Sequence, residues 1–544
     1  MHWDAKVPRF WRQDFKGLSE LGAVDGANIA DWPLTYDDLA PMYDAVEDRL
    51  GVQGDVKKMP DSTLAQAPRR NQFALAPNPS MVGAERLAAG ARKAGYTVYP
   101  FPMAVYSRPF NGGGRCNSCG FCSGFGCPIL ARGDAASSFL HDAMLAGAQL
   151  KTRCFVYKVD LGPDGRRAVG VSYIDEHGQK QHPRADIVVL APSAIETARL
   201  LLLSATPEHP NGLGNSSDQV GRNVMFHLVT VAAGIFQENL HTWRGPSTTG
   251  TIDDFVGPEQ GAPAKDAGLP YLKGGICEVG GGQLLRAEAA LYTTLPNHWG
   301  RQFKDLLRAS PLRVHLAGMS MVGEDLPQLD NRVDLDPNIK DFRGYPVARI
   351  THSNHRFELA AADFYGAKMA EICKQAPGVL ASGWLPVGAL ANATGGFASP
   401  YAGPSSTAHI MGTARMGDDP KTSVVDAWGK VHDLDNLYIA DGAVFTSSGG
   451  FNPTLTIMAL SLRAASRLGG ITRSPLAAGR PVATPPKTAS TGGRSDHTSS
   501  GSSTPTTAIA VGVGGVAVAA AGAAIAVKRS RQHQELDRPD TTAE

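Results

Sequence analysis

Residues 409–417 have the sequence HIMGTARMG, followed by YIADG at residues 438–442 and NPTLTI at residues 452–457. The apolar residues 437–440 predict a strand, so Asp441 and Gly442 come at its carboxyl end. Ligands bind at this edge of open α/β sheets. These segments therefore predict the ligand-binding edge of an α/β fold.

A second strand and helix are predicted further upstream. Ile187–Ala191 is a continuous apolar run, suited to a strand buried on both faces of a parallel sheet, and Ser193–Leu203 has helical spacing. Strand-like segments at 155–159 and 169–174 flank the turn Gly162–Gly165, as in a β-hairpin. The pattern predicts a β-meander beside a unit of a doubly wound domain.

Two other regions complete the predicted architecture. Trp32–Leu39 predicts a turn and an Asp-capped helix start, with an amphipathic helix continuing through Met42–Glu47. Between Met225 and Thr407, strand-like and helical segments alternate with many Gly and Pro residues. The fold class is therefore α/β (α+β), a Rossmann-like domain with an inserted mixed-sheet substrate domain.

Composition excludes several classes of function. The chain has 544 residues, 42% of them apolar and 19% charged, with a net charge of +1. Nucleic-acid binding is not expected, because the basic excess that neutralises a phosphate backbone is missing. Met1-His2-Trp3-Asp4 leads into mixed polar residues, so no secretory signal opens the sequence as given.

The three C-terminal segments, in this order and spacing, resemble the signature of the glucose-methanol-choline (GMC) oxidoreductases, nearest to pyranose-oxidase-like and gluconate-dehydrogenase-like members. The resemblance implies FAD as cofactor and oxidation of a CH–OH group of a sugar, polyol or sugar acid. It places His409 at the catalytic histidine and Asn452 at a position filled by His or Asn. Because an amide cannot act as a base, His409 is expected to take the proton and Asn452 to hold the substrate oxygen.

The same resemblance implies further FAD contacts. Asp441, Gly442, Asn452, Pro453 and Thr454 fall where the family approaches the flavin, and donors at the start of the helix Leu455–Leu468 would stabilise charge on the reduced ring. Val156 and Ala191 fall where backbone meets the adenosine half. His2 and Trp3 match a segment that passes the flavin, with His2 a candidate for contact or covalent attachment.

One part of the family pattern is missing from the sequence as given. The family begins with a strand, a Gly-x-Gly-x-x-Gly turn and a helix that receives the pyrophosphate. This first βαβ unit is not found, which predicts roughly a hundred further residues upstream of Met1. The alternative function is a membrane-displayed remnant that cannot hold FAD.

Four cysteines form a cluster of spacing C-x2-C-x2-C-x4-C-P, namely Cys116, Cys119, Cys122 and Cys127. The spacing is one residue longer than that of bacterial ferredoxins, and some flavin dehydrogenases of this family carry an iron–sulfur centre in the equivalent region. Disulfides and a structural zinc site remain alternatives. An iron–sulfur cluster would pass electrons onward from the flavin, to an acceptor such as a quinone or a cytochrome.

These patterns predict six segments. They are an FAD-binding domain (1–224), a substrate-binding domain (225–407), the C-terminal part of the FAD-binding domain (408–472), a disordered linker (473–507), a transmembrane helix (508–527) and a basic-then-polar tail (528–544).

The predicted transmembrane helix is uncharged from Ala508 to Val527. About twenty helical residues match a hydrocarbon core of roughly 30 Å. Because Lys528, Arg529 and Arg531 follow, the positive-inside tendency predicts a cytoplasmic C-terminus and an extracytoplasmic enzyme domain. A soluble cytoplasmic protein, with an Ala/Gly/Val tail that never inserts, is the alternative.

Truncation after Pro481 is expected to move the protein from the membrane to the soluble fraction, because it removes residues 508–527. Carbonate-washed membranes from cells that express the full chain or the truncated chain provide the measurement. A truncated chain that stays in the washed pellet would contradict the predicted anchor.

Overall fold

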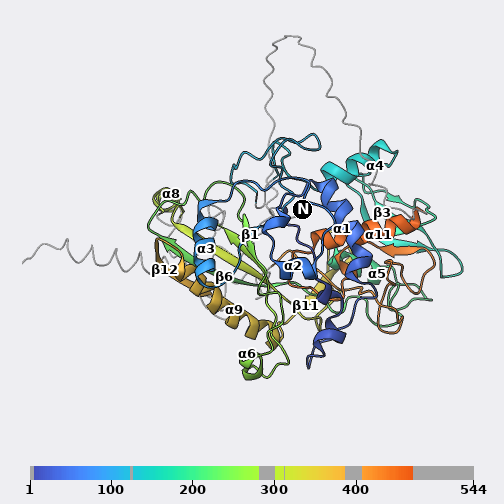
Figure 1. Ribbon diagram of the computed structural model, residues 1–544. Helices are drawn as coiled ribbons and strands as arrows, with labels where there is room; N and C mark the ends of the chain where they lie inside the picture. The colour runs from blue at the N-terminus through green and yellow to red at the C-terminus, as the bar shows by residue number, and fades with distance from the viewer. Residues whose placement is uncertain (1–4, 123–125, 281–299, 311–312, 386–406, 470–544) are drawn as a thin grey trace, which may run out of the picture.

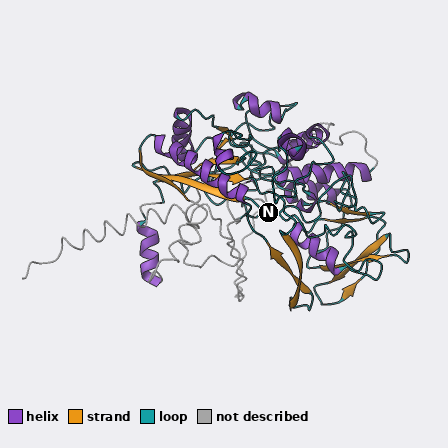
Figure 2. Cartoon of the chain, turned by 90° about the horizontal axis from the view of Figure 1, so that it is seen from below, coloured by secondary structure: helices purple, strands orange, loops and turns teal. Residues whose placement is uncertain are grey.

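The computed structural model describes residues 5–122, 126–280, 300–310, 313–385 and 407–469. Helices α3 and α9 lie on one side of the molecule and α1, α5 and α11 on the other (Figure 1). Turned by 90°, the strands fall into two separate groups (Figure 2). Each group has its own buried apolar cluster.

The larger group is a six-stranded sheet. Its order is β1 (Tyr99–Pro100), β7 (Gly250–Ile252), β8 (Gly275–Gly280), β9 (Leu316–Gly323), β6 (Leu228–Phe236) and β12 (Val379–Leu385). Every neighbouring pair is antiparallel, so the predicted mixed sheet is wrong. Several neighbours in the sheet are far apart in the sequence, such as β1 and β7 or β6 and β12.

Side chains of this sheet alternate between two environments. Cys277 and Val279 of β8 join the apolar cluster formed with α3 (Val82–Lys93) and α9 (Arg356–Gln375). Ile276 joins the cluster of the other half of the molecule. Because successive side chains of a strand point to opposite faces, Glu278 shares the face of Ile276. The sheet therefore presents a carboxylate toward the boundary between the two clusters.

Two strands of the smaller group form a parallel pair. β5 (Val188–Leu190) pairs with β13 (Leu437–Ile439), and α5 (Ala194–Leu203) follows β5. The predicted strand and helix are confirmed, but burial on both faces is wrong, because the side chains of Ile187 and Val189 are 44% and 47% exposed. The side chains of Val188 and Leu190 join an apolar cluster with Ala194 and Ala198 of α5, whereas Val189 is exposed.

The predicted β-meander is confirmed. β2 (Phe155–Leu161), β3 (Ala168–Ile174) and β4 (Lys180–Gln181) form a three-stranded antiparallel sheet. The turn between β2 and β3 contains Gly165 at φ 65°, a left-handed conformation that glycine adopts without strain.

The predicted N-terminal helix is α1 (Tyr36–Leu50), which packs against α11 (Thr454–Leu468). Its cap is Thr35 and not an aspartate. The Thr35 hydroxyl accepts from the Asp38 N–H, and the Asp38 carboxylate accepts from the Thr35 N–H at 2.8 Å. This capping box satisfies two backbone N–H groups at the helix start. Asp38, the third residue of the helix, supplies the carboxylate of the box.

The remaining elements are short or lie outside these sheets. They are η2 (Arg12–Phe15), η3 (Gly17–Leu21), η4 (Val56–Lys58), α2 (Asp61–Gln66), η5 (Ala136–Leu140), α4 (His141–Leu145), α6 (Ala262–Asp266), α8 (Gly300–Ala309), β10 (Arg332–Lys340), β11 (Pro346–Thr351) and η6 (Gly442–Val444).

Within these described ranges no helix is long and apolar enough to cross a bilayer. The predicted anchor at 508–527 and the linker at 473–507 lie outside the described residues and stay predictions. The predicted domain limits also stay predictions, although β1 and α3 pack with the large sheet from positions before residue 225.

Replacing Thr35 by Ala should lower the free energy of unfolding by about 1 kcal/mol, because the Asp38 N–H loses its acceptor. Urea unfolding followed by tryptophan fluorescence gives the measurement. Thr35→Ser keeps the hydroxyl and should retain most of the stability. An equal loss in both variants would show that the methyl group of Thr35, and not its cap, is responsible.

Candidate active site

Two histidines face each other where the chain enters β6. Met225 and Met411 form an antiparallel bridge, and each N–H donates to the other carbonyl at 2.9 Å. His227 lies two residues after Met225 and His409 two residues before Met411, so this register sets them opposite each other. Their Nδ1 atoms are 2.9 Å apart and the rings meet edge to face at 84°.

A buried carboxylate joins the proposed catalytic asparagine to a lysine. The Asn452 amide Nδ2 donates to Glu278 Oε1 at 3.1 Å, and Lys6 Nζ forms an ion pair with Glu278 Oε2. The Ser320 hydroxyl, opposite Glu278 on β9, donates to the same Oε2 at 3.2 Å. Both oxygens of the carboxylate are therefore bonded, as a buried charge requires.

The electrostatics of this cluster keep His409 neutral. Burial lowers the pKa of His409 to about 4, with the negative charge of Glu278 opposing the shift and Lys6 adding to it. Burial also holds the pKa of His227 well below its ordinary value, and His409 and Lys273 add to that effect. A neutral imidazole has one ring nitrogen with a free lone pair, and this is the form that can accept a proton.

For Glu278 the effect of its partners on the pKa outweighs the effect of burial. Burial raises its pKa, but the Lys6 ammonium and the hydrogen bonds from Lys6 and Asn452 outweigh burial and hold the pKa below its ordinary value. The carboxylate is therefore ionised beside the neutral His409. The two groups have distinct protonation states because their partners differ.

Asn452 carries an acceptor that the fold leaves unused. Because Glu278 accepts only, it fixes the Asn452 amide with Nδ2 toward the carboxylate. The Asn452 Oδ1 atom is buried, and no residue in the described part of the chain donates to it. A buried acceptor without a partner costs roughly 1–3 kcal/mol. This orphaned atom, directly before the N-terminus of α11, fits a bound polar group at the position where the family resemblance places flavin and substrate.

Asp441 and Gly442 have clear structural roles. The Asp441 carboxylate accepts from the N–H groups of Ser193 and Ala443 and from the Thr197 hydroxyl. It thereby ties the carboxyl end of β13 to the start of α5. A Cβ on Gly442 would lie 2.6 Å from the Ile410 carbonyl, so a side chain there would displace the segment that carries His409.

Pro453 and Thr454 begin α11 as predicted, with Pro453 as the cap residue. Val156 on β2 and Ala191 just after β5 are both exposed. His2 and Trp3 lie outside the described residues. The structure therefore brings His409 and Asn452 together around Glu278, while Val156 and Ala191 belong to the other strand group.

The predicted metal site at Cys116, Cys119, Cys122 and Cys127 finds no support. In the part of the chain that the structure describes, no three His, Cys, Asp or Glu side chains gather closely enough to hold a metal ion. Two of the sulfur atoms have other partners: Cys116 Sγ accepts from the Ser118 N–H at 3.4 Å and Cys127 Sγ from the Ala131 N–H at 3.3 Å.

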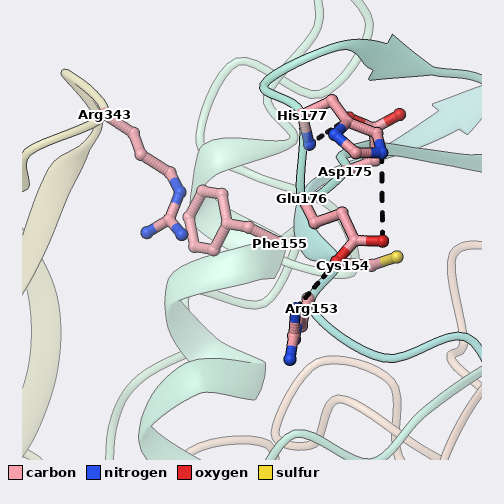
Figure 3. A pocket seen from close by; sticks show the side chains of 7 residues that line it. All are labelled: Arg153, Cys154, Phe155, Asp175, Glu176, His177 and Arg343. Atoms are coloured by element: carbon pink, nitrogen blue, oxygen red, sulfur yellow. Dashed lines mark hydrogen bonds and ion pairs between the residues drawn. The ribbon is translucent and has the colours of Figure 1, made fainter. Parts of the chain in front are cut away.

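A separate open pocket of about 630 Å³ lies beside the β-meander (Figure 3). It is lined by Arg153, Cys154, Phe155, Asp175, Glu176, His177 and Arg343. Its charges pair with one another, since Glu176 accepts from Arg153 at 3.0 Å and lies 3.9 Å from His177 Nε2. None of the residues around His409 lines it, so we do not assign the chemistry to this pocket.

Sequence reasoning missed His227, Glu278 and Lys6. Glu278 lies within the wholly buried strand β8. Because buried acids are rare unless paired, this carboxylate could have drawn attention to the site. His227 and Lys6 gave no local signal. Their partners lie 182 and 272 residues away in the chain.

Comparison with known proteins identifies the family of this site. Two family models described as GMC oxidoreductase match residues 27–229 and 327–461. The 2-methyl-1,2-propanediol dehydrogenase of Mycolicibacterium austroafricanum is 30% identical over 479 residues, 85% of this chain and 78% of that protein. The fructose dehydrogenase large subunit of Gluconobacter japonicus is 29% identical over 485 residues, 86% and 79% of the two chains.

A solved structure shows the same fold. A formate oxidase variant of Aspergillus oryzae has a TM-score of 0.56 and 14% sequence identity, and the match covers 87% of this chain and 83% of that one. The family resemblance inferred from the three C-terminal segments is confirmed by the family models.

Stability should decrease as the pH falls from the ordinary histidine value of 6.5 toward 4, because folded His409 has a pKa of about 4 and stays neutral while the unfolded chain takes up a proton. His409→Asn removes this titration, so its unfolding free energy should depend less on pH in that window. Urea unfolding at a series of pH values gives the measurement. Above about pH 7 the difference between variant and wild type should be constant. Parallel curves over the whole range would contradict the assignment.

Proposed function

The chain belongs to the GMC oxidoreductase family, and from this premise we propose that it oxidises a CH–OH group of a sugar, polyol or sugar acid, with His409 as the base and FAD as the cofactor. The names of two relatives, a propanediol dehydrogenase and a fructose dehydrogenase large subunit, support this substrate class. The observation that carries the proposal is a neutral His409 beside the Asn452–Glu278–Lys6 cluster.

His409 would take the hydroxyl proton of the substrate. Its lowered pKa keeps the imidazole neutral at pH 7, which is the form that accepts a proton. FAD, when bound, accepts the hydride that leaves the same carbon. The substrate thus loses a proton to the protein and two electrons with the second hydrogen, and a carbonyl results.

Asn452 would orient the substrate oxygen. One N–H of its amide donates to Glu278, which leaves a second N–H and the unpartnered Oδ1 for a ligand. An amide N–H that points toward an alkoxide stabilises developing negative charge. The Lys6–Glu278 pair fixes the orientation of this amide, since the Glu278 carboxylate accepts and cannot donate.

The residues that would hold FAD fall into two groups. Asn452, Pro453 and Thr454 at the start of α11 would lie along the flavin, where helix N–H groups stabilise negative charge. The backbone of the exposed residues Val156 and Ala191 would meet the adenosine half. His2 and Trp3 are further proposed contacts from the sequence.

We also propose that electrons leave to an acceptor such as a quinone or a cytochrome, and that residues 508–527 anchor the enzyme in a membrane. The uncharged length of this segment and the basic residues that follow it support this arrangement. A membrane position would bring the flavin close to a lipid-soluble acceptor.

In a chain that includes the upstream nucleotide-binding unit, His409→Ala should leave FAD bound but slow its reduction by substrate by about a hundredfold or more, because a positioned base is lost. Stopped-flow absorbance of the flavin under anaerobic conditions gives the rate, and the flavin absorbance per protein reports FAD content. His177→Ala, in the pocket of Figure 3, is the control and should reduce FAD at the wild-type rate.

A different outcome would reassign the residues. An unchanged rate of reduction with a raised Michaelis constant would make His409 a binding residue. A slow His177→Ala variant would move the chemistry to the pocket beside the β-meander.

A further inference from the structure

The partner of His409 has a fixed protonation pattern. His227 Nε2 lies 3.3 Å from the Ser448 carbonyl oxygen, and a carbonyl oxygen accepts but never donates. The Nε2 atom of His227 therefore carries a proton and donates it to Ser448. Because buried His227 is neutral, this is its one ring proton, and its Nδ1 has a bare lone pair.

The position of the ring proton on His409 follows from that on His227. The Nδ1 atoms of His227 and His409 are 2.9 Å apart, which is hydrogen-bond distance. Two bare lone pairs would repel at this distance, so His409 Nδ1 carries a proton and donates it to His227. Neutral His409 has no further ring proton, and its Nε2 is therefore unprotonated.

We propose that His227 is a positioning residue, which fixes the proton of His409 on Nδ1 and so leaves His409 Nε2 as the atom that accepts the substrate proton. The inference rests on the proposed function of His409 and adds which nitrogen reacts and what selects it. When the substrate O–H bond breaks and an N–H bond forms at Nε2, the His409 Nδ1–H continues to donate to His227.

The Ser448 carbonyl that starts this chain is held by buried polar groups. The Ser448 hydroxyl donates to Glu324 Oε1 at 3.2 Å and accepts from the Asp325 N–H at 2.9 Å. The next N–H, of Gly449, also donates to Glu324 Oε1, at 2.9 Å. Such networks rigidify the groups that they satisfy. The carbonyl therefore keeps its direction toward His227.

Burial and nearby cations oppose a second proton on the histidine pair. Lys273, which forms ion pairs with Asp14 and Glu324, is the cation that disfavours protonation of His227. On the other side, Lys6 disfavours and Glu278 favours protonation of His409. His227 therefore stays the acceptor of the His409 Nδ1–H, and the substrate proton goes to His409 Nε2.

Nitrogen-15 NMR of the protein labelled at histidine, recorded at pH 8 with FAD bound, measures the tautomer directly. The His409 signals are assigned by their loss in His409→Gln. The wild type should show His409 protonated at Nδ1 and bare at Nε2. His227→Asn offers an acceptor oxygen at the position of Nδ1 and should keep this tautomer, whereas His227→Leu should lose it.

Flavin reduction gives the second readout. His227→Leu should slow reduction by about ten- to a hundredfold with little change in the Michaelis constant, as found when groups that orient a catalytic side chain are removed. His227→Asn should recover most of the rate. A purely structural role of His227 would not produce rescue by the variant that restores the acceptor.

Several results would overturn the inference. A wild-type His409 protonated at Nε2 would do so without any variant, even if His227→Leu fails to fold. A His227→Leu protein that keeps the Nδ1 proton would do so as well. If instead the tautomer behaves as expected but His409→Ala reduces FAD at the normal rate, the proposed function fails while the tautomer assignment stands.

Discussion

The site depends on one close approach between two backbone segments. A Cβ on Gly412 would lie 1.9 Å from the Asn223 carbonyl oxygen, and Gly412 itself has φ 78°. Glycine is required on both grounds. This contact lets Met411 bond to Met225, which fixes the register that sets His227 opposite His409. A slip of one residue would turn one of the rings to the other face.

The large sheet supplies the charged part of the site through the alternation of its strands. Its face toward α3 and α9 is apolar, while the other face carries Glu278 and Ser320. An isolated carboxylate there would be neutralised by burial, but Lys6 keeps it ionised. Removing one partner of a buried ion pair typically costs about 3–5 kcal/mol. The fold therefore ties the orientation of Asn452 to an N-terminal lysine.

The sequence was informative where a feature is local. The hairpin β2–β3, the unit β5–α5 and the start of α11 follow from turn residues and periodicity, and His409 and Asn452 follow from family motifs. Long-range features could not be predicted in this way. The exposure of Val189 depends on what covers its strand, and the role of Glu278 depends on Lys6, 272 residues away. The iron–sulfur site predicted from the cysteine spacing finds no support among the described residues.

The side chains around His409 have separate roles and do not exchange protons with one another. Glu278 is ionised and bonded at both oxygens, so it orients Asn452 without competing for the substrate proton. Asn452 does not titrate. His227 already donates to the Ser448 carbonyl and has only a lone pair to offer His409. Of these four side chains, only His409 is both partly exposed and a neutral imidazole with a ring nitrogen that has no assigned partner. The arrangement therefore leaves proton transfer to one atom, His409 Nε2. The surrounding groups act by orienting the side chains that meet the substrate.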